Sequence, residues 1–276
     1  MNRSILPLLI MLVIAACSPK PTEQEKQPET TQVKLTTSKG DIVLQLYNET
    51  PQHRDNFIKI VEDGVLDSVL FHRVIETFMI QSGDPDSKLA GPEDTLGNGG
   101  LLYTVPAEFH PDLFHKKGAL GAARDNNPEK ASSSTQFYIV QGKVFTDSLI
   151  DAAQNRINGW LAESFLRQDS AYLPYIDSMN VALMSGDRET YFRFSNYLKT
   201  EAETKEEFDP HIIPESQRDV YKTIGGSPHL DQNYTVFGEV VSGLEVVDSI
   251  AAVATNPLDR PLEDVRILKV EVISKE

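Results

Sequence analysis

The sequence contains little of three things that would narrow its function: cysteine, clustered basic residues and long apolar runs. Cys17 is the single cysteine among 276 residues, so no disulfide can form within the chain. Lys and Arg number 26 against 41 Asp and Glu, and the formal net charge is -15. Nucleic-acid binding needs clustered cations that neutralise phosphates, so this balance argues against a nucleic-acid partner. The acidic excess favours solubility.

Three kinds of chemical signature are also missing. The run LGNGG at 96–100 lacks the Gly-Lys-Ser/Thr of a phosphate-binding loop and predicts turns instead. No serine lies in a Gly-x-Ser-x-Gly elbow, and the one cysteine lies near the amino terminus. Several histidines are scattered without the spacing of zinc ligands: His53, His72, His110, His115 and His211. We therefore expect neither a metal nor a cofactor.

A short apolar stretch near the amino terminus ends at the cysteine. Arg3 supplies a positive charge, residues 5–16 are apolar but too few to span a bilayer, and small residues precede Cys17. The motif IAAC resembles a bacterial lipoprotein box, which implies that residues 1–17 are a signal peptide and that Cys17 carries lipid. A membrane-anchored protein of the cell envelope, facing the periplasm or the cell surface, would result. An ordinary cleaved signal peptide with an incidental cysteine is the alternative.

Alternating patterns predict many short strands. Two alternating runs, VKLTT and IVLQLY, flank the turn SKGD and predict a β-hairpin. Thr50 and Pro51 predict the cap and first turn of a helix, and apolar residues at helical spacing continue to Gly64. Many strands with only two interspersed helices favour a closed barrel. Further strands are expected near 69–75, 78–82, 118–123, 135–140, 234–241 and 265–273, with a helix at 244–251.

The segment 143–225 differs from the rest because its apolar residues follow helical spacing and its aromatic residues are concentrated. We expect three or four packed helices there, inserted between 32–142 and 226–276. Residues 18–31 contain three prolines and no large apolar residue, so they should form a disordered tether.

The stretch LFHRVIETFMIQSGD, 70–84, places Arg73 inside an apolar run. A long charged side chain is seldom buried without a partner, and here it would lie beside apolar residues and Gln81, which suits a proline ring. The alternative is that Arg73 lays its stem on apolar surface and keeps its head in water.

Together with GALGAARDNNPEKASSSTQFYIV at 118–140 and YTVFGEV at 234–240, this stretch resembles the cyclophilins, a family of proline cis/trans isomerases. The resemblance covers about 33–142 and 226–276. It implies a mainly β fold: a closed eight-stranded antiparallel barrel with two capping helices, here with an inserted helical subdomain. It also implies that Arg73 is catalytic and that Gln81 supports it. The implied substrate-binding residues are Phe78, Met79, Ala123, Arg124, Gln136, Tyr138, His229, Leu230 and Tyr234.

Four of these positions depart from the common family pattern. Arg124 replaces an asparagine that is often present, and Tyr138 replaces a phenylalanine. His229 stands where the best-known members have tryptophan, and Tyr234 where they have histidine. His229 can also be explained as a turn residue after Pro228. The substitutions leave Arg73 in place.

Two functions follow from the resemblance. The first is a membrane-tethered peptidyl-prolyl isomerase whose partners are proline-containing peptides and exported proteins that are folding. The second is a weakly catalytic peptide-binding chaperone that uses the helical insertion as its main surface. Because the insertion leaves just after Tyr138 and returns just before Leu230, we expect it to lie beside the groove and to select or hold substrate.

Overall fold

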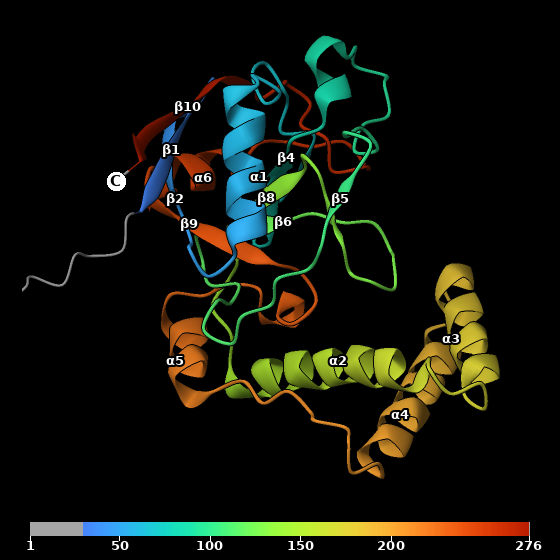
Figure 1. Ribbon diagram of the computed structural model, residues 1–276. Helices are drawn as coiled ribbons and strands as arrows, with labels where there is room; N and C mark the ends of the chain where they lie inside the picture. The colour runs from blue at the N-terminus through green and yellow to red at the C-terminus, as the bar shows by residue number, and fades with distance from the viewer. Residues whose placement is uncertain (1–29, 276) are drawn as a thin grey trace, which may run out of the picture.

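The computed structural model describes residues 30–275, in which one curled antiparallel sheet carries a helical insertion on one side (Figure 1). The sheet order is β10-β1-β2-β9-β6-β8-β4-β3. Its strands are β1 (Thr31–Thr37), β2 (Gly40–Leu46), β3 (Arg73–Ile75), β4 (Met79–Ser82), β6 (Ala119–Ala122), β8 (Phe137–Val140), β9 (Val236–Ser242) and β10 (Ile267–Lys275). A separate pair consists of β5 (Thr104–Val105) and β7 (Ser132–Ser133).

The expected closed barrel is not confirmed, and the sheet is better described as a half-barrel. Within residues 30–275 no ladder joins its two edge strands, β3 and β10. Isolated bonds span the seam, including those from the Ser68 and Phe71 N–H groups to the Ile267 and Val265 carbonyls, at 2.9 and 2.8 Å. Ser68 has φ +69°, so the chain that leads into the three-residue β3 is too irregular to continue the ladder.

Two helices cover the half-barrel, α1 (Pro51–Glu62) and α6 (Leu244–Ala251). Phe57 of α1 packs edge-on against Phe137 and at a tilt against Phe237, at centroid distances of 5.4 Å each. The helix start was predicted correctly, with Pro51 in the first turn. The capping bond was not, because the Thr50 side chain makes no cap hydrogen bond and its buried hydroxyl has no partner among the described residues.

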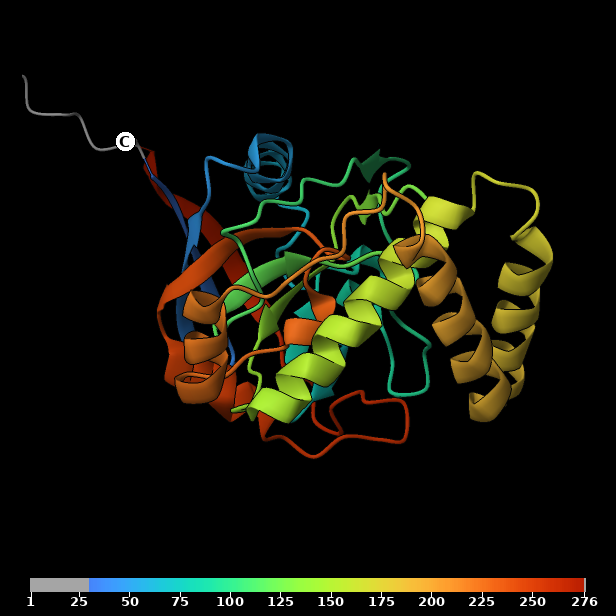
Figure 2. The same ribbon diagram turned by 90° about the horizontal axis from the view of Figure 1, so that it is seen from below.

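The insertion consists of α2 (Asp147–Leu166), α3 (Leu173–Ser185), α4 (Arg188–Glu203) and α5 (Glu215–Thr223). Figures 1 and 2 show α5 near the start of α2, and α3 and α4 at its far end. The chain enters and leaves at one point, since Lys143 and Gly226 exchange backbone hydrogen bonds of 3.2 and 3.0 Å. A Cβ on Gly226 would lie 2.2 Å from the His115 carbonyl oxygen, so this crossing requires glycine.

Two separate apolar clusters divide the insertion. We call the first part the root: α5, the segment before it and residues 147–159 of α2, with Ile150, Ile157, Ile213 and Tyr221 buried together. We call the second part the tip: residues 160–166 of α2 with α3 and α4, packed around Ala162, Leu166, Tyr172, Ile176, Met179, Leu198 and Ala202. The root therefore lies against the half-barrel, and the tip has a small core of its own.

Candidate active site

A cavity of about 160 Å³ opens where β3, β4, β6 and β8 meet the 3-10 turn Pro228–Leu230. The antiparallel register of β3 and β4 places Arg73 directly opposite Gln81. The structure thus brings together nine of the eleven pocket residues expected from the sequence. The nine lining residues are Arg73, Phe78, Met79, Gln81, Ala123, Arg124, Tyr138, Leu230 and Tyr234.

Arg73 lies at the edge of this cavity with its guanidinium held from two sides. Its Nη1 donates to Gln81 Oε1 at 3.3 Å, and its Nε lies 3.6 Å from Asp259 Oδ2. The side chain is 43% exposed, so it is neither buried in an apolar run nor simply surrounded by water. Asp259 was missed by the sequence reasoning because it lies in the loop before β10, far from the motif that contains Arg73.

Gln136 lies outside the cavity and supports it. Its Oε1 accepts from Gln81 Nε2 at 3.2 Å, while its Nε2 donates to the Gly97 and Gly99 carbonyls at 2.9 and 2.8 Å. The glycine-rich segment at 96–100 is therefore held against Gln136 as irregular chain with a bend at Gly97, and the expected turns are not formed. A neighbouring cavity of about 550 Å³ has Gln81, Gln136, Ala123 and Arg124 in its walls.

Ala123 and Arg124 differ in how much of their backbone is available to a ligand. The Ala123 N–H donates to the Gln136 carbonyl at 3.0 Å, and its carbonyl accepts from the Ser133 N–H at 2.8 Å. The backbone N–H and C=O of Arg124 make no hydrogen bond within residues 30–275. Both residues line the cavity, and of the two only Arg124 has backbone groups without a partner within residues 30–275.

Tyr138 forms the floor of the cavity opposite a glycine. A Cβ on Gly121 would lie 2.3 Å from the Tyr138 ring, so only glycine at this position leaves room for the tyrosine. The Tyr138 hydroxyl is hydrogen-bonded to His115 Nε2 at 2.8 Å. Burial raises the pKa of Tyr138 well above its usual value, so the hydroxyl stays protonated.

His115 continues a buried hydrogen-bonded chain into the insertion. Its Nδ1 lies 2.7 Å from Asp231 Oδ1, and Asp231 Oδ2 accepts from the Tyr221 hydroxyl of α5 at 2.6 Å. His115 and Asp231 lie 116 residues apart in the sequence, which offers no local signal for the pairing. This chain, Tyr138–His115–Asp231–Tyr221, joins the floor of the cavity to the root, and the sequence reasoning missed it. We call it the buried polar chain.

His229 and Tyr234 support the walls in different ways. The His229 ring stacks on Phe78 at 5.5 Å from behind the cavity wall, and burial is the main cause that lowers its pKa to about 4. The residue is thus both part of a turn and a support for Phe78. Tyr234 lines the cavity, edge-on to Tyr138 at 6.1 Å, with the Arg124 guanidinium 4.7 Å from its ring centre.

The family comparison agrees with this geometry. The family model described as "Cyclophilin type peptidyl-prolyl cis-trans isomerase/CLD" matches residues 32–159 and 216–272. The chain belongs to the cyclophilin-type peptidyl-prolyl cis-trans isomerase family. The unmatched stretch between these two segments, 160–215, contains the whole tip and the connection from it to α5.

Similar proteins cover nearly the whole chain. Proteins named "Putative peptidyl-prolyl cis-trans isomerase" are 28% identical over 250 residues in Staphylococcus aureus (strain USA300) and 26% identical over 253 residues in Staphylococcus haemolyticus (strain JCSC1435). These alignments cover 90% and 91% of this chain and 95% and 96% of the relatives.

A crystal structure of a Cryptosporidium parvum cyclophilin type peptidyl-prolyl cis-trans isomerase shares the fold, with a TM-score of 0.52 and 16% identity. The match covers 90% of this chain and 99% of that one. A second crystal structure, obtained in the presence of the dipeptide Ala-Pro, matches with a TM-score of 0.51.

Proposed function

We propose that this cyclophilin-type isomerase accelerates rotation about X-Pro bonds in exported polypeptides, and that Arg73 stabilises the twisted prolyl amide. The observation that carries the proposal is the position of Arg73: a half-exposed guanidinium, held by Gln81 and Asp259, at the edge of an apolar cavity. The cavity floor and walls, which include Phe78 and Met79, suit a proline ring. The Ala-Pro dipeptide used with the Cryptosporidium protein supports the same class of ligand.

The chemistry follows from the electronic structure of the amide. Resonance holds the X-Pro bond planar with a barrier of about 18–20 kcal/mol. As the bond twists, the prolyl nitrogen becomes pyramidal and gains a lone pair that accepts a hydrogen bond. A guanidinium donor placed there stabilises the twisted state more than the planar one, and this difference accelerates the rotation. An acceleration of the rotation by five orders of magnitude requires the barrier to fall by about 7 kcal/mol.

The roles of the neighbours follow from their contacts. Gln81 and Asp259 fix the orientation of the guanidinium, which leaves its remaining N–H groups available to the prolyl nitrogen. The free N–H and C=O of Arg124 can pair with an extended substrate backbone. No nucleophile, metal or cofactor takes part in this scheme.

Replacing Arg73 tests the mechanism. We expect Arg73→Ala to lower kcat/KM on a short Ala-Pro peptide by roughly 100-fold or more, as loss of a transition-state donor does. Arg54→Ala, in the first turns of α1 with partners Asn48 and Asp55, is the matched control and should change it less than about twofold. Full activity in Arg73→Ala would remove Arg73 from the mechanism.

A weakly catalytic chaperone is the second candidate, and the tip supplies the observation that favours it. Val181 and Met184 on α3 are 66% and 89% exposed, so apolar surface is available there for unfolded chains. Wild-type protein that fails to isomerise the short peptide but still suppresses aggregation of an unfolded protein would support this second function.

We also propose that the protein is a lipoprotein of the cell envelope. Cys17 and the rest of the expected signal peptide lie outside the described residues. Within residues 30–275 no helix has the length and apolarity of a membrane span. Cys17→Ser should release the protein from membranes into the soluble fraction. A mature amino terminus beyond residue 17 without lipid, seen by mass spectrometry, would contradict the proposal.

A further inference from the structure

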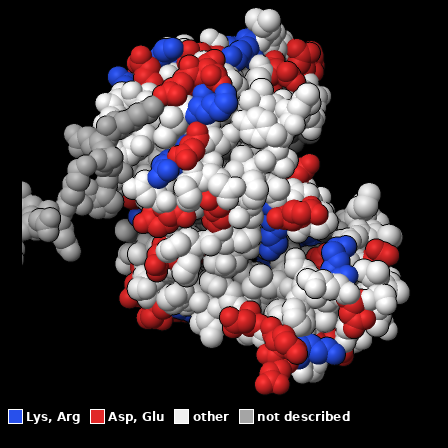
Figure 3. Space-filling model, viewed as in Figure 1, with Lys and Arg blue, Asp and Glu red and all other residues white. Residues whose placement is uncertain are grey.

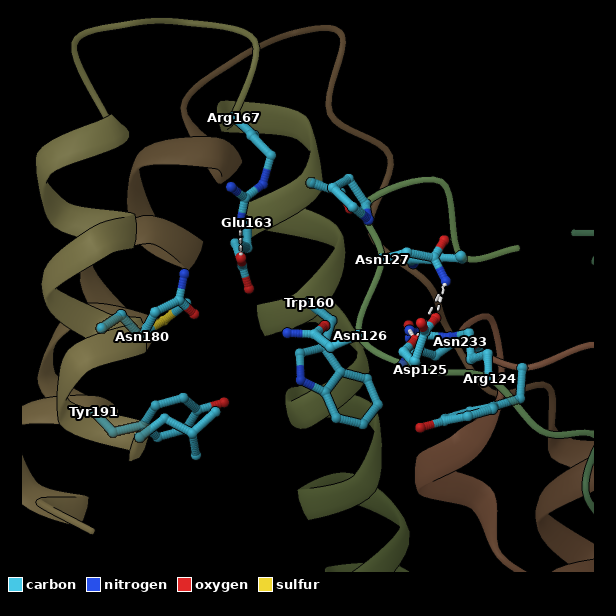
Figure 4. Close-up of a pocket in the computed structure, with 16 residues that line it drawn as sticks. Arg124, Asp125, Asn126, Asn127, Trp160, Glu163, Arg167, Asn180, Tyr191 and Asn233 are labelled. Atoms are coloured by element: carbon cyan, nitrogen blue, oxygen red, sulfur yellow. Dashed lines mark hydrogen bonds and ion pairs between the residues drawn. The ribbon is translucent and has the colours of Figure 1, made fainter. Parts of the chain in front are cut away.

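A larger cavity, about 560 Å³, lies between the 124–130 loop of the half-barrel and the tip (Figure 4). The loop contributes Arg124 and Asn126 to one wall, and the opposite wall contains Trp160 of α2, Asn180 of α3 and Tyr191 of α4. Figure 3 shows the molecular surface hollowed between the half-barrel and the tip at the right of the view. The size is within the range of pockets that hold ligands.

This cavity adjoins the Arg73 cavity. Arg124 and Tyr234 contribute to the walls of both. The Arg73 cavity also shares Gln81, Ala123 and Arg124 with the cavity beside the glycine-rich segment. A polypeptide whose proline lies at Arg73 can therefore continue past Tyr234 and into the cavity under the tip.

Four polar side chains in the walls of the cavity are free to bind a ligand. The side-chain amides of Asn126 and Asn180, the indole N–H of Trp160 and the hydroxyl of Tyr191 have no hydrogen-bond partner within the described part of the chain. A polypeptide backbone presents one donor and one acceptor at almost every residue, which matches this set of amides and hydroxyls.

The charges of the cavity argue for a neutral ligand. Three cations and two carboxylates contribute to the walls, and most of them already have partners. Arg167 pairs with Glu163, and the Arg124 guanidinium donates to the Asn233 carbonyl and side chain at 3.0 and 2.9 Å. An anion such as phosphate would have to displace these bonds. The apolar side chains of Met179 and Leu183 and the Trp160 ring instead suit the side chains of an unfolded chain.

We infer that the cavity between the 124–130 loop and the tip is an accessory substrate site, which binds an uncharged, apolar or aromatic segment of the client several residues from its proline. The inference rests on the proposed function, because the client is the polypeptide whose proline Arg73 serves. The site contacts substrate residues away from the X-Pro bond. It therefore strengthens the binding of long substrates, and short substrates, which do not reach it, are unaffected.

Trp160 provides a direct reporter, because it is the only tryptophan of the chain. Wild-type protein is titrated with a four-residue proline peptide and with peptides of about twelve residues that carry Phe and Leu on one side of the proline or the other. We expect one of the two long peptides to change Trp160 emission and to have a KM roughly tenfold below that of the short peptide, with a similar kcat. The short peptide should leave the emission unchanged.

Two substitutions in the wall and one beside it complete the test. Tyr191→Ala and Asn180→Ala should each weaken binding of the favoured long peptide by roughly five- to twentyfold, as central interface residues do. Phe192→Ala is the matched control, because Phe192 follows Tyr191 on α4, is 59% exposed and does not line the cavity. All three variants should turn over the short peptide like wild type, with unchanged circular dichroism.

Two outcomes overturn the inference: no emission change with any long peptide, or equal weakening by Tyr191→Ala and Phe192→Ala. Failure of the proposed function gives a different result, namely no turnover of the short peptide by wild type. The emission titration does not depend on turnover. It can be repeated in Arg73→Ala, where the favoured long peptide should still change Trp160 emission.

Discussion

The root and the tip of the insertion are both helical, yet they are attached to the rest of the molecule in different ways. In the root, the Tyr221 hydroxyl is fully buried and bonded to Asp231, which in turn holds His115 beneath the cavity floor. In the tip, side chains pack mainly on one another, and Leu183 and Met184 are 59% and 89% exposed. The comparison shows that the root is hydrogen-bonded to the floor of the Arg73 cavity, whereas the tip leaves apolar side chains exposed.

The boundary seen by the family model supports the same division. The first matched segment ends at residue 159 and the second begins at residue 216, so residues 147–159 of α2 and all of α5 except Glu215 belong to the part shared with the family. Changes in the root should therefore reach the Arg73 cavity through Tyr138. Changes in the tip should alter only what a long substrate contacts.

The largest expected effect comes from Asp231→Ala, which leaves His115 and Tyr221 buried without their partner. We expect the free energy of unfolding to fall by about 3–5 kcal/mol, measured by chemical denaturation. Asp177→Ala, at an exposed position of α3, is the matched control and should change it by less than about 0.5 kcal/mol. Equal losses in the two variants would mean that the buried polar chain does not distinguish root from tip.

Acid should weaken the half-barrel before it affects the tip, because no histidine lies in residues 160–208. His72 is 5% exposed, and burial is the main cause that lowers its pKa to about 4. Between pH 6.5 and 4 the unfolded chain binds more protons at His72 than the folded protein does, so stability falls as the pH decreases through this window. The stability that depends on an uncharged His72 is fully present above pH 6.5.

The pKa of His72 is about 4 in the folded protein and about 6.5 in the unfolded chain. From this difference we expect His72 to lower the unfolding free energy by about 1–2 kcal/mol between pH 7 and pH 5. His72→Gln should remove the part of this slope that His72 contributes, because glutamine does not titrate, while the part due to His229, whose pKa burial also lowers to about 4, remains. Denaturation curves that coincide at pH 7 and pH 5 in the wild-type protein would contradict the argument.

A smaller effect is expected from Tyr221→Phe, which removes a single hydroxyl from the buried polar chain. This substitution should lower the free energy of unfolding by about 1 kcal/mol, because Asp231 keeps its bond to His115. Tyr172→Phe removes a comparable hydroxyl bond in the tip, to the partly exposed Glu201, and should cost less than half as much. Thermal denaturation resolves the difference. A larger loss in Tyr172→Phe would reverse the comparison.

Much of the fold could be predicted because its signals are local. Alternation predicted the β1–β2 hairpin, and Pro51 with the apolar spacing that follows predicted α1. The helical spacing of 143–225 predicted the helices of the insertion. The closed barrel that the sequence led us to expect is not confirmed. Whether the sheet closes depends on how Ser68 and the irregular chain before β3 meet β10, and no local pattern predicts this contact.

The candidate site divides in the same way. The residues of the Arg73 cavity could be found because sequence motifs contain them. Asp259 and the buried polar chain could not, because each depends on contacts between segments far apart in the chain. The Tyr138 hydroxyl is the one sequence clue to this chain, since a buried phenol needs a hydrogen-bond partner. The sequence does not say that the partner is His115.

Removing α3 and α4, the part of the tip beyond α2, tests the division between root and tip most directly. Residues 168–207 are replaced by a Gly-Ser linker, which keeps α2, α5 and the buried polar chain. Turnover of a four-residue proline peptide should stay within about threefold of wild type, because the Arg73 cavity is untouched. Catalysed refolding of a proline-limited protein should slow by roughly tenfold or more, because binding energy remote from the proline is lost. Equal losses on both substrates, or no loss on either, would contradict the account.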